Sequence, residues 1–124
     1  MQLTIQKSKS LLSLIFLFLT FQVVAQDQNL TGSWEGTLTT QGVELPVIFN
    51  ISKAEGGYSS TMDSPAQGAT GIPMDETKVS GNEITILFQQ SGIKYVAKLE
   101  GDKLQGTFYQ AGLELPLKMT KVDK

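Results

Sequence analysis

Apolar and polar side chains alternate along most of the chain after residue 31, and this two-residue period predicts β-strands. The run Leu45–Ile51 and the run Leu113–Met119 show the alternation most clearly. We expect about eight strands, near residues 32–40, 43–53, 57–63, 74–80, 83–90, 93–100, 103–110 and 113–122. No window carries the 3.6-residue apolar stripe that is typical of an amphipathic helix.

Short turn signals separate these runs, among them Gln41-Gly42, Ser91-Gly92 and Ala111-Gly112. Their spacing of roughly ten residues is typical of an antiparallel meander. Closing such a meander into a barrel removes the exposed edges of an open sheet. The pattern therefore predicts an all-β fold, an antiparallel meander of about eight strands that closes into a small lipocalin-like barrel.

The first 25 residues have the parts of a secretory signal peptide, namely Lys7 and Lys9, the apolar run 11–21, and Val23-Val24-Ala25 before a cut. The apolar run is shorter than the roughly 20 residues that a spanning helix needs, which disfavours a retained anchor. We expect a signal peptide at 1–25, a flexible lead-in at 26–31 and one β-barrel domain at 32–124. The protein is then exported, to the periplasm or the extracellular space.

Composition narrows the chemistry of the part that follows residue 25. It has no His, no Cys and no Arg, and eight lysines against twelve acidic residues give it a net charge of −4. The usual zinc ligands and a Ser-His-Asp triad are therefore missing. An acidic chain without Arg is also a poor ligand for nucleic acid and for anionic membranes. We expect no catalytic residue, no metal and no cofactor.

A hairpin motif occurs twice, as GTLTTQGVELPV at 36–47 and as GTFYQAGLELPL at 106–117, with six of the twelve positions identical. The shared Glu44 and Glu114 lie opposite the Leu-rich face, which indicates solvated surface rather than a carboxylate pair of the kind that glycosidases use. Proline lacks the N–H that a ladder needs. Pro46 and Pro116 are therefore predicted to mark a bulge or a gap in pairing.

The segment 63–75, DSPAQGATGIPMD, interrupts the series of short turns and has no evident counterpart elsewhere in the chain. A long irregular segment in a small domain is either functional or a connector. The presumed interior holds enough bulky side chains to favour a packed core over a large cavity. Four apolar residues fall on the opposite face, where they form a partner-binding patch if they cluster: Ile48, Leu87, Val96 and Tyr109.

The stretches that carry a resemblance to a known family are Gly32–Leu38, Leu45–Ile51, Met62–Pro73, Gly106–Gln110 and Leu115-Pro116-Leu117. They resemble the small N-terminal β-domain that precedes the catalytic domain of many secreted bacterial α/β-hydrolases of the serine-peptidase type. The likeness implies the β fold, export and an association with hydrolytic enzymes. It implies no catalytic residue, because the sequence has no Gly-x-Ser-x-Gly nucleophile elbow.

We therefore expect a secreted, non-enzymatic β-barrel that docks on another protein, with an extracytoplasmic hydrolase as one such partner. The alternative is a lipocalin-like binder of a small apolar or glycan ligand at the barrel mouth. The candidate contact residues come from the 63–75 segment and from the strand that ends near 110: Asp63, Ser64, Pro65, Gln67, Gly68, Gly71, Ile72, Pro73, Tyr109 and Gln110.

Overall fold

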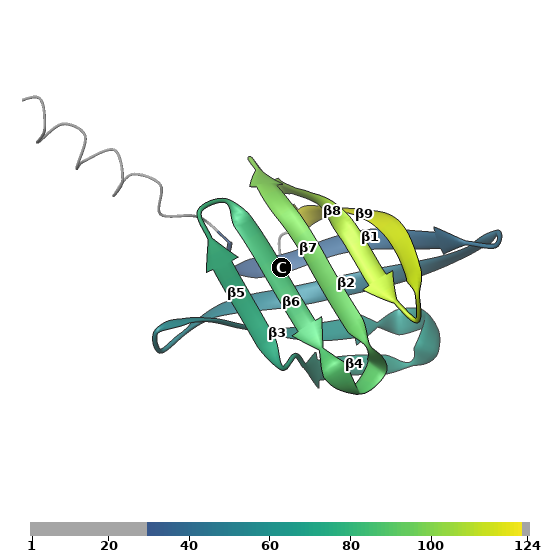
Figure 1. The fold of residues 1–124 in the computed structure, drawn as a ribbon, viewed down its shortest axis with the longest axis horizontal. Helices are drawn as coiled ribbons and strands as arrows, with labels where there is room; N and C mark the ends of the chain where they lie inside the picture. The colour runs from purple at the N-terminus through teal and green to yellow at the C-terminus, as the bar shows by residue number, and fades with distance from the viewer. Residues whose placement is uncertain (1–29, 123–124) are drawn as a thin grey trace, which may run out of the picture.

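The computed structural model describes residues 30–122, and this part of the chain forms one curled antiparallel sheet with two 3₁₀ turns (Figure 1). The strands are β1 (Gly32–Thr40), β2 (Val43–Ala54), β3 (Gly57–Ser64), β4 (Ala69–Pro73), β5 (Glu76–Ser80), β6 (Glu83–Phe88), β7 (Ile93–Glu100), β8 (Lys103–Gln110) and β9 (Leu113–Val122). The turns are η1 (Pro65–Gln67) and η2 (Gln89–Ser91). No helix in this part of the chain is long and apolar enough to cross a membrane. The predicted signal peptide lies outside the described residues.

The sheet has the order β4-β3-β2-β1-β9-β8-β7-β6-β5, and it curls so that β5–β8 face β1–β3. The sheet closes where β5 and the residue Met74 before it meet β3, the strand next to the end, through single bonds rather than through a ladder. The Met74 amide donates to the Ser60 carbonyl at 3.0 Å, and the hydroxyls of Ser60 and Thr77 lie 2.7 Å apart. The predicted all-β, barrel-like meander is thus confirmed as a half-barrel, with nine strands instead of eight.

The additional strand corrects the prediction that residues 63–75 form an irregular loop. Ala69–Pro73 is strand β4, and Pro65–Gln67 is a 3₁₀ turn. Strand β4 pairs with β3 through Thr61↔Pro73, Met62↔Ile72 and Ser64↔Ala69, with a register shift between the last two pairs. The segment lacks a clean alternation because it contains Gly71 and Pro73, which are depleted in strands.

Aromatic side chains fill the centre of the half-barrel. The rings of Phe49 and Tyr95 stack with centroids 5.5 Å apart, and the Tyr95 hydroxyl donates a 2.7 Å hydrogen bond to the Leu117 carbonyl. Burial raises the pKa of Tyr95 above its ordinary value, so that the phenol remains a donor. The Trp34 indole donates to the Leu30 carbonyl at 2.9 Å. Leu30 is only 1% exposed, so the predicted flexible lead-in does not extend to it.

The two copies of the hairpin motif share a conformation. Each turn has two residues, and both have positive φ: 52° at Gln41 and 78° at Gly42, and 52° at Ala111 and 80° at Gly112. These values are typical of a type I′ turn, whose twist suits a two-residue hairpin. The duplicated sequence therefore forms the same turn twice, and each turn places one residue other than Gly in the left-handed region.

The prolines of the duplicated motif lie in unbroken hairpin registers, Thr37↔Pro46 and Thr107↔Pro116. The prediction of a bulge is wrong. The predicted gap in pairing is present on the side of each proline strand that faces away from its hairpin partner. There β2 pairs with β3 only from Ile48 onward, and β9 pairs with β1 only from Thr120 onward. Each proline lacks an N–H at a place where no strand of the described chain requires one.

Candidate functional site

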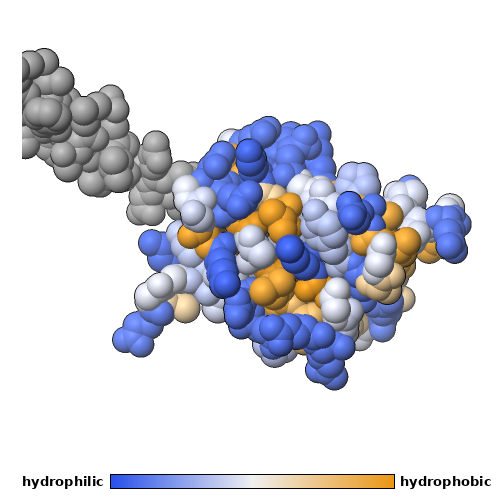
Figure 2. All heavy atoms as spheres, in the orientation of Figure 1, coloured by the Kyte–Doolittle hydropathy of each residue, from blue (hydrophilic) through white to orange (hydrophobic). Residues whose placement is uncertain are grey.

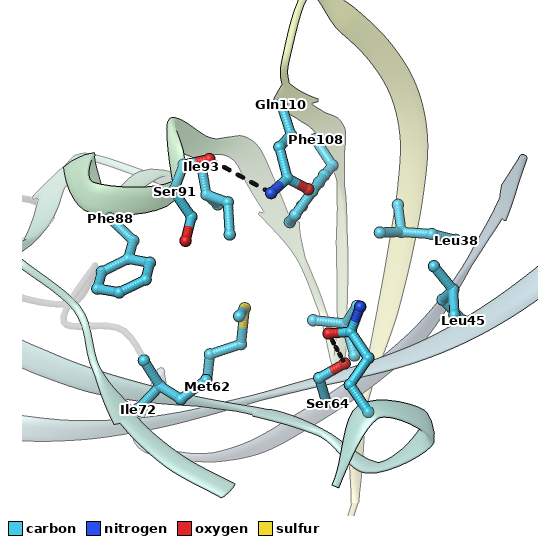
Figure 3. Close-up of a pocket in the computed structure, with 12 residues that line it drawn as sticks. Leu38, Leu45, Met62, Ser64, Ile72, Phe88, Ser91, Ile93, Phe108 and Gln110 are labelled. Carbon is cyan, nitrogen blue, oxygen red and sulfur yellow. Dashed lines mark hydrogen bonds between the residues drawn. The ribbon is translucent and has the colours of Figure 1, made fainter. Parts of the chain in front are cut away.

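A pocket of about 150 Å³ opens at one end of the half-barrel, where the β1–β2 hairpin, the β8–β9 hairpin and both 3₁₀ turns converge (Figure 3). The β1–β3 half contributes the apolar side chains of Leu38, Leu45, Val47 and Met62. The rest of the sheet contributes those of Ile72, Phe88, Ile93 and Phe108. The core below is packed as predicted, and this cavity lies at its end.

Four uncharged polar residues complete the lining: Ser64, Gln67, Ser91 and Gln110. The buried Ser64 donates from its Oγ to Gln67 Oε1 at 2.9 Å. On the side of the mouth opposite Ser64, Gln110 Nε2 donates to the Ser91 carbonyl at 3.3 Å. Both amides are thereby held at the rim and keep further donor and acceptor positions for a bound group. No charged residue lines the pocket within the described chain.

Two 3₁₀ turns of the same construction form opposite lips of the pocket. In each, a glycine in the left-handed region ends the turn, with φ of 68° at Gly68 and 65° at Gly92. Each glycine amide donates at 3.0 Å to the first carbonyl of its turn, that of Pro65 or of Gln89. The predicted single-copy segment thus has a geometric counterpart at η2, which sequence comparison missed because only the glycine is shared.

Asp63 lies outside the pocket and holds the η1–β4 segment in place. Its Oδ1 accepts a 2.7 Å hydrogen bond from the Gly71 amide, and its Oδ2 accepts one at 3.1 Å from Asn50 Nδ2. The Asn50 side chain is also bonded to Ser33 and Thr61. This network connects the four neighbouring strands β1–β4 and holds η1, one of the two lips of the pocket, in place.

The ten predicted contact residues therefore have different positions. Ser64, Gln67, Ile72 and Gln110 line the pocket. Five shape the segment behind it, namely Asp63, Pro65, Gly68, Gly71 and Pro73. Tyr109 lies on the outer face, where Lys94 Nζ lies 5.5 Å from its ring centroid.

Sequence reasoning did not identify most of the apolar lining. Leu38 and Phe108 are the clearest case, because they occupy equivalent positions of the duplicated motif and both line the pocket. That equivalence was the available signal. Alternation alone cannot distinguish a residue that lines a pocket from one that is fully packed, because both point inward.

The proposed outer-face patch exists only in part. The registers place Leu87, Val96 and Tyr109 on the neighbouring strands β6, β7 and β8, whereas Ile48 lies apart on β2. Leu87 and Tyr109 both pair with Lys94, so a charge lies between them. Figure 2 shows this face, with hydrophobic residues over β6 and β7 and hydrophilic ones between them.

The arrangement is suited to holding a neutral apolar group. Apolar cavities of this size bind benzene-sized molecules, and drug-sized ligands occupy pockets of roughly 300 Å³ or more. Within residues 30–122 no three His, Cys, Asp or Glu side chains lie close enough together to hold a metal ion. Comparison of the chain with protein-family models, with curated proteins and with solved structures gave no match.

Proposed function

We propose that this protein is an exported, non-enzymatic binding module that docks on another protein through the mouth of its half-barrel. The observation that carries the proposal is the pocket of about 150 Å³, which is apolar inside and has uncharged amides at its rim. Anchor side chains of protein interfaces enter pockets of this kind, surrounded by a polar rim that excludes water. The partner therefore supplies one apolar side chain, of the size of Leu, Met or Phe.

The partner class follows from the family resemblance, which makes an extracytoplasmic hydrolase the first protein to test.

Two rigid lips favour docking without rearrangement of the module. Both 3₁₀ turns are closed by a backbone hydrogen bond, and the segment that contains η1 is further held by Asp63. A preformed site avoids the entropy cost of ordering loops when the partner binds.

The experiment that tests docking is capture of the partner from the native compartment with three forms of the protein. Ser91→Phe fills the mouth from the exposed η2 lip, where the Ser91 side chain points toward the pocket (Figure 3). Tyr109→Ala removes an aromatic side chain from the outer face and is the matched control. We expect Ser91→Phe to lose the wild-type partner and Tyr109→Ala to keep it. Loss with Tyr109→Ala alone would move the contact to the outer face.

The second candidate is a binder of a free small molecule. It is favoured by the eight apolar side chains of the partly open pocket, which accommodate a benzene-sized ligand without any partner protein. The lining favours an apolar molecule over a glycan, because only four of the lining residues are polar. Mass spectrometry of the protein released under native conditions distinguishes the two, as a retained small molecule or as a bound protein.

A further inference from the structure

The open edge of β1, residues Thr37–Thr40, has hydrogen-bonding groups that no neighbouring strand uses. In a two-residue hairpin the residues flanking the turn, here Thr40 and Val43, form a hydrogen-bonded pair, and bonded and non-bonded pairs then alternate. Thr39 and Thr37 therefore direct their N–H and C=O groups away from β2. The backbone groups of Ser33 and Glu35 also point away from β2, and there they face β9. The β1–β9 register ends at Glu35, so it does not reach Thr37.

Three other edges at this end of the described chain carry residues that block strand addition. One is the outer edge of the terminal strand β4, which contains Pro73. Beyond its ladder with β3, strand β2 directs Glu44 and Pro46 outward. Beyond its ladder with β1, strand β9 directs Glu114 and Pro116 outward, whereas the Lys118 carbonyl still lies against Gly36 of β1. Charged residues and proline are the usual protection of an edge against pairing with another chain. Among these edges within residues 30–122, the β1 edge at Thr37–Thr40 alone carries neither, and it presents threonines, which have high strand propensity.

The open edge lies next to the pocket. Leu38, between Thr37 and Thr39, is 5% exposed and lines the cavity. Residues that lie opposite each other in paired strands point to the same face of the sheet. A residue of an added strand that lies opposite Leu38 therefore points into the mouth.

We propose that the partner presents an extended segment that adds to β1 along Thr37–Thr40 and places one apolar side chain in the pocket. This inference rests on the proposed docking function and names the form of the partner. Main-chain hydrogen bonds supply affinity in strand addition, and pockets for alternate side chains supply specificity.

The surrounding charges define the rest of the segment. The residues that lie opposite Thr37 and Thr39 point outward, where Glu35, Glu44 and Glu114 are exposed and Lys118 is the nearby cation. A polar–apolar–polar segment with a Lys or Arg at an outward position complements this face.

The test is selection of seven-residue peptides from a random phage-displayed library on the purified protein, followed by amide hydrogen exchange of the complex. We expect selected peptides to carry a single apolar residue between polar or basic ones. In the free protein the Thr39 amide should exchange quickly, and the peptide should slow it about tenfold or more. The Leu38 amide, which is bonded to β2, should be protected in both states.

Two variants of Thr39 complete the test. Thr39→Pro removes only an outward N–H, as Pro46 and Pro116 do, and should weaken peptide binding about tenfold, whereas Thr39→Val should not. A different result would overturn strand addition and leave docking intact. In that case the peptides bind, lose binding in Ser91→Phe, and leave the Thr39 amide unprotected. Selection of no peptide above an empty-surface control would count against both proposals.

Discussion

Pro46 and Pro116 occupy equivalent positions of two hairpins, and each faces away from its hairpin partner at a place where no strand of the described chain lies alongside. The preceding Glu44 and Glu114 face the same way. The Glu-Leu-Pro that the two copies share is therefore edge protection. The leucine between them, Leu45 or Leu115, packs against the core. This accounts for the Glu-Leu-Pro that the two copies have in common.

Replacing both prolines by threonine should make the protein self-associate. The substitution restores an N–H donor and strand propensity at two free edges, which are then open to edge-to-edge pairing. Light scattering coupled to size exclusion should show oligomers that increase with concentration. Pro65→Ala, in the η1 turn, is the matched control and should remain as the wild type. An unchanged double variant would remove the explanation of the duplicated motif.

Substitutions in the two hairpin turns should increase the stability of the protein. Gln41 and Ala111 have φ of 52°, a conformation that costs most residues about 1 kcal/mol and that asparagine tolerates better. Gln41→Asn and Ala111→Asn should each raise the free energy of unfolding by roughly 0.5–1 kcal/mol, or a few degrees in Tm. Gln90→Asn in η2, where φ is not positive, should have little effect. Equal responses at all three positions would contradict the turn assignment.

The leading glycines of the duplicated motif should not accept alanine. A Cβ at Gly106 would overlap the Val96 carbonyl oxygen, and one at Gly36 would lie 2.5 Å from the carbonyl oxygen of Lys118. Both contacts are to backbone, so we expect destabilisation of about 1–3 kcal/mol or more in denaturant titrations. Gly57→Ala is the control, because its Cβ would meet nothing within 4 Å and its φ is negative or extended. Tolerance at Gly106 would mean that β7 and β8 lie farther apart than described.

Tyr95→Phe should destabilise the fold by about 1 kcal/mol, the net contribution of the lost hydrogen bond to Leu117. The effect should depend on pH. Since burial raises the pKa of Tyr95 in the folded state, wild-type stability is complete below the ordinary tyrosine pKa of 10.0 and decreases as pH rises above it. Phenylalanine has no proton to lose. The difference between the two proteins in urea midpoint should therefore shrink from pH about 8 to pH about 11, and a constant difference would contradict the burial of an ionisable phenol.

Much of the fold could be predicted from the sequence, and the site only in part. Alternation in runs such as Leu45–Ile51 and two-residue turns such as Gln41-Gly42 carry information that is local in the chain, so the hairpins were identified correctly. Strand β4 was missed because Gly71 and Pro73 obscure its alternation, and because the hydrogen bond from the Gly71 amide to Asp63 is visible only in the folded chain. The pocket was missed because its walls come from distant hairpins, and only the folded chain brings Leu38 and Phe108 to one mouth.

The most direct test of the central claim is whether the pocket at the barrel mouth takes up an apolar group. Toluene titrated into methyl-labelled protein and followed by NMR needs no knowledge of the partner. We predict saturable shifts at the methyl groups of Leu38, Leu45 and Ile93, which are lost in Ser91→Phe. The absence of saturable shifts there, or equal shifts at Leu87 and Val96 on the outer face, would contradict the account.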